Sequence, residues 1–203
     1  MKTDVISVNS SGAGMEEALA LAEKTAQDLP GKAGMRLRLL AEEMMCLVRE
    51  IAGGMEADFW IETGDDKAHL HLKTDTLMYV EKRKEFLAVS STGENALAKG
   101  MLGKIRNVFE TALLPKDERA AMETRMGLVG MGDPGSLSSL STGSQDSWSM
   151  NAYAQNVQEG ADDYSKEARE ELERSIIANL ADEVSIAIRG NHVEMIVEKA
   201  LNA

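Results

Sequence analysis

The stretch that decides the fold is Arg174–Val197, RSIIANLADEVSIAIRGNHVEMIV, in which a helical segment passes directly into a β-hairpin. Alternating apolar residues lie on both sides of Gly190-Asn191, a dipeptide that favours a two-residue turn. With this turn, the predicted cross-strand pairs are Ile188 with Val193, Ile186 with Met195 and Val184 with Val197. A slip of one residue would bury charged side chains instead, so the sequence predicts the register as well as the hairpin.

A second hairpin is predicted upstream, with residues 65–66 as its loop. In this register Phe59 lies opposite Leu72 and Ile61 lies opposite Leu70, so the apolar side chains share one side. A short strand is expected at residues 5–8. Apolar residues spaced three and four apart predict helices over about 15–29, 35–51, 94–114 and 162–182. The second helix is the most apolar and should lie on the sheet, with its core-facing stripe made of Leu40, Met44, Leu47 and Ile51.

This order of elements predicts an α+β fold, a two-layer α/β sandwich in which a mixed, mostly antiparallel sheet is covered on one face by helices. The 203 residues are enough for a single domain, 1–203. Residues 127–149 are rich in Gly, Ser and Thr and contain no lysine or arginine. We therefore expect about 126–160 to be flexible, with a local anchor at Trp148, Met150 and Tyr153.

Composition narrows the classes of partner. With 22 basic and 34 acidic residues the net charge is −12, which opposes binding to nucleic acid or to an anionic membrane surface. No apolar run is long enough for a membrane span, and the opening residues do not resemble a secretion signal. The single cysteine, Cys46, cannot form an internal disulfide, and we expect it to be a small buried residue. We expect a cytoplasmic protein.

The element order, and the closing helix and hairpin above all, resemble the GHKL-type ATP-binding domain of histidine kinases and anti-sigma-factor kinases. The resemblance covers about residues 15–201, with 77–165 in the place of the family's ATP lid. It implies a histidine-kinase-like fold and four nucleotide-binding motifs, each of which has a counterpart in this sequence.

The first two motifs lack their key side chains. In the family's Glu-x-x-x-Asn, the Asn holds magnesium and the Glu often acts as the base; here Glu43 matches the Glu, and Leu47 replaces the Asn. A leucine has no oxygen to offer a hard cation, which leaves Glu43 as a vestigial base candidate or an ordinary surface carboxylate. In the family's Asp-x-Gly-x-Gly, Asp75 matches the adenine-binding Asp, but Leu77 replaces the first glycine.

The remaining motifs are also degenerate. The family's phosphate-binding Gly-x-Gly turn corresponds to residues 168–174, which contain no glycine and have more acidic than basic side chains. The family's Gly-Thr in the last hairpin corresponds to His192-Val193, and Val193 has no hydroxyl. A separate Gly130-Met131-Gly132 is weak evidence for a phosphate loop because no apolar-periodic helix follows it.

Other constellations do not build a convincing site. His69 and His71 project to the same side of a strand and could ligate a metal, but the hairpin offers no third ligand, so a solvated strand face is the preferred interpretation. We therefore expect no metal and no cofactor, with ATP and Mg²⁺ as the alternative.

The sequence thus favours a non-catalytic, anti-sigma-factor-like regulatory domain that binds another protein, such as a sigma factor or a signalling partner. The first alternative is an ATP-dependent serine-protein kinase of the same family with unusual motifs. A second alternative is a structural or scaffold module unrelated to nucleotide. The sequence does not predict the oligomeric state.

Overall fold

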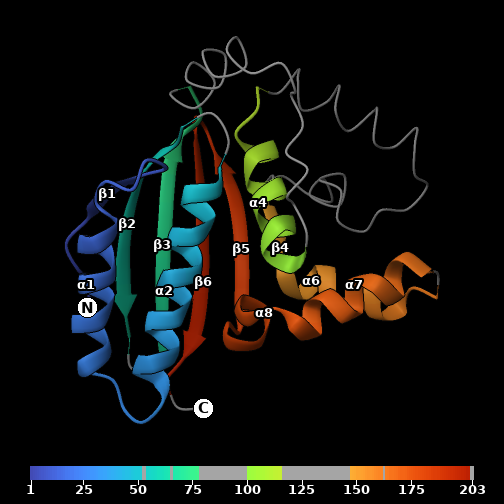
Figure 1. Cartoon of the computed structure of the whole chain (residues 1–203), viewed down its shortest axis with the longest axis horizontal. Helices are drawn as coiled ribbons and strands as arrows, with labels where there is room; N and C mark the ends of the chain where they lie inside the picture. Colours follow the sequence, from blue (N-terminus) through green and yellow to red (C-terminus); the bar gives the residue numbers. More distant parts are fainter. Residues whose placement is uncertain (52–53, 65, 78–99, 116–146, 162, 202–203) are drawn as a thin grey trace.

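The computed structural model describes residues 1–51, 54–64, 66–77, 100–115, 147–161 and 163–201. In this part of the chain six strands form one sheet in the order β1-β2-β3-β6-β5-β4 (Figure 1). The strands are β1 (Ile6–Asn9), β2 (Glu56–Thr63), β3 (Lys67–Asp75), β4 (Ser147–Ser149), β5 (Glu183–Arg189) and β6 (His192–Ala200). All five pairings are antiparallel. The sheet is therefore antiparallel rather than mixed, because β3 and β6, which join the two hairpins, also run in opposite directions.

Helices cover one face of the sheet. In Figure 1, α1 (Met15–Gln27) lies in front of the strands at the β1 side, α2 (Ala33–Glu50) lies in front of the middle of the sheet, and α4 (Gly100–Ala112) lies in front of β5 and β4. Three further helices, α6 (Met150–Glu159), α7 (Asp163–Arg174) and α8 (Ile176–Leu180), are grouped at the β5 side. This confirms the predicted α+β arrangement of a sheet with one helical layer. Within the described ranges, no helix has the length and apolar character that crossing a membrane requires.

Both predicted hairpin registers are confirmed. Phe59 lies opposite Leu72 and Ile61 opposite Leu70. In the last hairpin the observed pairs are Ile188 with Val193, Ile186 with Met195 and Val184 with Val197. The apolar side chains of both hairpins therefore face the helices and form one core with them.

The second helix supplies the centre of that core. Leu40, Met44 and Leu47 are each 0% exposed and recur at helical spacing on the face of α2 that packs on the sheet. The helix also lies very close to α1, because a Cβ built on Gly34 would stand 2.3 Å from the Ala26 carbonyl oxygen. Only glycine permits this approach without moving the two helices apart.

One predicted helix is two helices in the structure. The pattern over 162–182 predicts a continuous helix, but α7 ends at Arg174 and α8 begins at Ile176. Between them the Ser175 hydroxyl accepts a hydrogen bond from the Ala178 backbone N–H at 3.3 Å, so Ser175 caps the second helix. Local capping therefore prevails over the continuous apolar periodicity.

The end of the predicted flexible segment is regular structure. Residues 147–149 form β4 and residues 150–159 form α6, within the segment of about 126–160 for which the sequence predicts flexibility. Glu183 organises this segment, because its Oε1 accepts hydrogen bonds from the N–H groups of Met150 (3.0 Å) and Asn151 (3.3 Å). The predicted anchor residues Trp148, Met150 and Tyr153 are buried. Residues 126–146, including Gly130-Met131-Gly132, lie outside the described residues.

Candidate functional site

Two of the four positions that match the family's nucleotide site lie in the core. Leu47 on α2 and Val193 on β6 are both 0% exposed and belong to the same cluster of buried apolar side chains. Their side chains fill the interface between the helical layer and the sheet. They are therefore packing residues at the positions where the family has a magnesium ligand and an adenine-binding hydroxyl.

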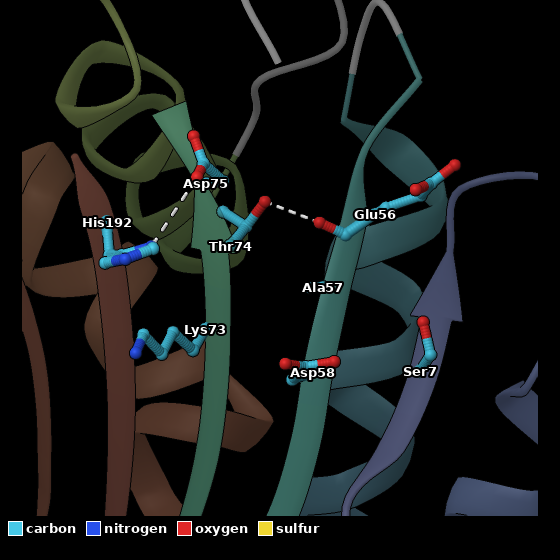
Figure 2. Close-up of a pocket in the computed structure, with 8 residues that line it drawn as sticks. All are labelled: Ser7, Glu56, Ala57, Asp58, Lys73, Thr74, Asp75 and His192. Carbon is cyan, nitrogen blue, oxygen red and sulfur yellow. Dashed lines mark hydrogen bonds and ion pairs between the residues drawn. The ribbon is translucent and has the colours of Figure 1, made fainter. Parts of the chain in front are cut away.

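Asp75 lies on the opposite face of the sheet. In β3 the alternate residues Leu70 and Leu72 enter the core, whereas Asp75 projects from the face that no described helix covers. Its Oδ1 accepts a hydrogen bond from the Leu77 backbone N–H at 2.8 Å, and its Oδ2 lies 3.9 Å from His192 Nδ1 (Figure 2). The structure thus does not bring Asp75 together with Leu47 and Val193.

Glu43 is half-buried on α2 and has carboxylate neighbours. Burial raises its pKa, and the negative charges of Glu42 and Glu50 raise it further. Cys46, expected to be buried, is exposed on the same side of the helix, which corrects that prediction. Partial burial of the thiol and the nearby charge of Glu43 raise its pKa. This side of α2 is therefore electronegative and unfavourable for a phosphate group.

A buried positive charge beside this acidic surface already has a partner. Arg106 on α4 is 2% exposed, and its Nη1 lies 2.9 Å from Glu50 Oε2. The segment that matches the phosphate-binding turn, residues 168–174, lies within helix α7 and offers no loop of free N–H groups. This segment therefore does not form the phosphate-binding turn that the sequence resemblance implies.

The uncovered face of the sheet is polar. We call it the open face and define it by side chains on the two central strands: His69, His71, Lys73 and Asp75 on β3 and His192, Glu194 and Glu198 on β6. All three histidines of the chain lie here. Each faces a carboxylate, with separations of 3.1 Å for His69–Glu198, 3.0 Å for His71–Glu194 and 3.9 Å for His192–Asp75.

An aromatic stack lies within the open face. The rings of Trp60 and His71 are parallel, with 4.6 Å between their centroids, and the Lys2 ammonium lies 4.6 Å from the centre of the Trp60 ring. The Trp60 indole N–H donates to Glu62 at 2.9 Å, and this hydrogen bond lowers the pKa of Glu62. No group of three or more potential metal ligands occurs within the described ranges. His69 and His71 are thus held by carboxylates on a sheet face.

A pocket of about 250 Å³ opens at one end of this face. It forms where β2 and β3 separate. The last β2–β3 pair is Asp58 with Lys73, and beyond it Thr74 and Asp75 pair only with β6. The Thr74 hydroxyl donates to the Glu56 carbonyl oxygen across the gap (Figure 2). The lining residues are Ser7, Glu56, Ala57, Asp58, Lys73, Thr74, Asp75 and His192.

Of these lining residues, the sequence singled out only Asp75, through its family motif, and His192, as the neighbour of Val193. The pocket needs four strands, β1, β2, β3 and β6, in their observed order, and that order is a long-range property. The only available signal was the strand alternation, which places Asp58 and Lys73 on the polar side. No protein-family model, curated protein or solved structure matches this chain, so the resemblance to the ATP-binding family rests on the sequence motifs.

Proposed function

We propose that this chain is a non-catalytic regulatory domain, similar to an anti-sigma factor, that acts by binding another protein. The observation that carries the proposal is the complete burial of Leu47 within the core. A leucine at that position contributes to packing and supplies no ligand for magnesium, and catalysis of phosphoryl transfer depends on such positioned charge.

The electrostatics support the same conclusion. A nucleotide would bring several negative charges to a side of α2 where Glu42, Glu43 and Glu50 already repel one another. The chain as a whole carries a net charge of −12. Both facts oppose the binding of a polyphosphate, and neither opposes a protein partner.

The open face supports a protein partner. It presents histidines and carboxylates on neighbouring strands, and no described helix covers it. Non-obligate protein interfaces are about as polar as the rest of a protein surface, which is compatible with a face of this composition. A sigma factor or another signalling protein is the class of partner that the family resemblance suggests.

Calorimetric titration with a non-hydrolysable ATP analogue and Mg²⁺ tests the absence of nucleotide chemistry. We expect a Kd no tighter than about 1 mM, which corresponds to roughly −4 kcal/mol. Magnesium-dependent binding in the micromolar range would instead favour the alternative, an ATP-dependent serine-protein kinase with unusual motifs.

A binary interaction screen against the sigma factors and signalling proteins of the source organism tests the partner. A specific partner whose binding is weakened by His69→Ala, and not by Met35→Ala on α2, would support the open face as the contact surface. If no protein in such a screen binds, the second alternative, a structural module without a regulatory partner, is favoured.

A further inference from the structure

The pocket at the end of the open face contains two charges of opposite sign that have no partner among the residues the structure describes. Asp58 and Lys73 lie directly opposite each other on β2 and β3 and project from the same face. Opposite charges in such positions usually pair across the strands. Here, in the part of the chain that the structure describes, neither side chain has a hydrogen bond or an ion pair.

The separation of the strands explains why the two charges remain apart. Asp58 and Lys73 form the last β2–β3 pair before the strands diverge. In Figure 2 the Lys73 ammonium is directed toward β6, whereas the Asp58 carboxylate stays on β2. The two charges therefore stand on different sides of the pocket, with the Thr74 side chain above them between the strands.

The other lining groups favour the same kind of ligand. His192 and Asp75, 3.9 Å apart, add an imidazole ring and a second carboxylate at the β6 side. The volume of about 250 Å³ is below the roughly 300–1,000 Å³ typical of sites for drug-sized molecules, so the ligand should be small. An anion alone would be repelled by the carboxylates, and a cation alone would leave Lys73 without a partner.

We propose that this pocket binds a small zwitterion, with the ligand's ammonium group on Asp58 and its carboxylate on Lys73. A free amino acid has both groups, and each contact would be a charge-assisted hydrogen bond. This site is independent of the proposed protein partner, because it requires neither the absence of nucleotide nor a bound protein.

The test is an NMR titration of the whole chain with glycine, β-alanine and γ-aminobutyrate, which differ in the spacing of their two charges. Propylamine and propionate serve as single-charge probes. We expect saturable shifts of the Thr74 and Asp75 amides with a Kd of about 1 mM or tighter for at least one zwitterion. Both single-charge probes should bind at least about tenfold more weakly.

Two variants and two matched controls identify the contacts. Asp58→Asn and Lys73→Met should each weaken binding at least about tenfold while leaving the unfolding temperature unchanged, because neither side chain has a partner among the described residues. Glu17→Gln and Lys24→Met make the same chemical changes at exposed positions on α1, across the sheet, and should leave the Kd unchanged. The proposal is overturned if no zwitterion gives a saturable shift, if propylamine binds as tightly as the best zwitterion, or if Lys73→Met binds like the wild type.

Discussion

The Asp182 carboxylate accepts two hydrogen bonds from the buried Lys199 ammonium, at 3.1 and 3.0 Å. Lys199 lies on β6 and has a side chain only 6% exposed, whereas Asp182 is in the turn before β5 and is 39% exposed. The carboxylate also accepts from the Ala200 backbone N–H. This contact joins the end of the last strand to the chain that follows α8.

The Asp182 contact predicts a loss of stability in acid. Burial raises the pKa of Asp182, but the Ala200 N–H and the Lys199 ammonium outweigh burial and hold it below the ordinary 3.8. A carboxyl with a lowered folded-state pKa contributes stability above its unfolded pKa and loses it as the pH falls through the folded value. Asp182→Asn should therefore lower the free energy of unfolding by roughly 1–2 kcal/mol at pH 7, a modest value because the carboxylate is partly exposed to solvent. Urea unfolding of both proteins should show this difference shrinking below about pH 3.8. A constant difference from pH 7 to pH 2.5 would contradict this assignment.

Leu47→Ala should cost about 2–5 kcal/mol, because the leucine is 0% exposed and its truncation leaves a cavity in the core. Chemical denaturation measures the effect. Met35→Ala on the same helix removes a side chain that is 59% exposed and should change stability by no more than about 0.5 kcal/mol. A nearly neutral Leu47→Ala would mean that this position faces an open site.

Leu47→Asn should not create nucleotide binding. The amide would supply the oxygen that the family uses for magnesium, but the glycines of the other motifs would still be missing, and Asp75 would remain on the other face of the sheet. Calorimetry with the ATP analogue and Mg²⁺ should give no Kd tighter than about 1 mM. A strong gain in affinity would show that the motif alignment is wrong.

Glu183→Gln should loosen β4 and α6. The carboxylate accepts from the N–H groups at the start of α6, where a negative charge also interacts favourably with the helix dipole. The free energy of unfolding should fall by about 1 kcal/mol. Amide hydrogen exchange should accelerate more in residues 150–159 than in β6. Glu167→Gln on the exposed side of α7 is the control. Unchanged exchange in α6 would mean that apolar packing of Trp148 and Tyr153 holds this segment without the charge.

Glu43→Gln should stabilise the protein at neutral pH. Burial and the charges of Glu42 and Glu50 raise the pKa of Glu43 above 4.5, so folding favours the protonated form. The associated stability is present below pH 4.5 and is lost as the pH rises through the folded-state pKa. Glutamine mimics the protonated form, so the unfolding temperature at pH 7 should rise by no more than about 2–4 °C. Glu16→Gln on α1 should give no rise, and an equal rise in both variants would point to net charge as the cause.

Local patterns predicted the hairpins, because alternation and a two-residue turn specify which residues pair. Features that depend on distant groups were missed. The start of the helix at residues 150–159 is capped by Glu183, which lies beyond two further helices in the chain. Cys46 lies between the buried Met45 and Leu47 but points to the acidic side of α2, so a small error in helical phase changed its predicted exposure. The pocket could not be predicted because its charges come together only through the order of the strands.

On the central strands, side chains that face the core alternate with side chains on the open face, and the two sets are under different evolutionary constraints. On β3, exchanging Lys73 or His69 alters charge and hydrogen bonding on the open face without altering the volume of the core. Exchanging Leu70 or Leu72, each 0% exposed, alters the volume of the core without altering charge on the open face. Single substitutions can therefore vary the open face while the fold is kept, and a library restricted to Lys67, His69, Lys73 and Asp75 of β3 should yield folded proteins with altered surface charge.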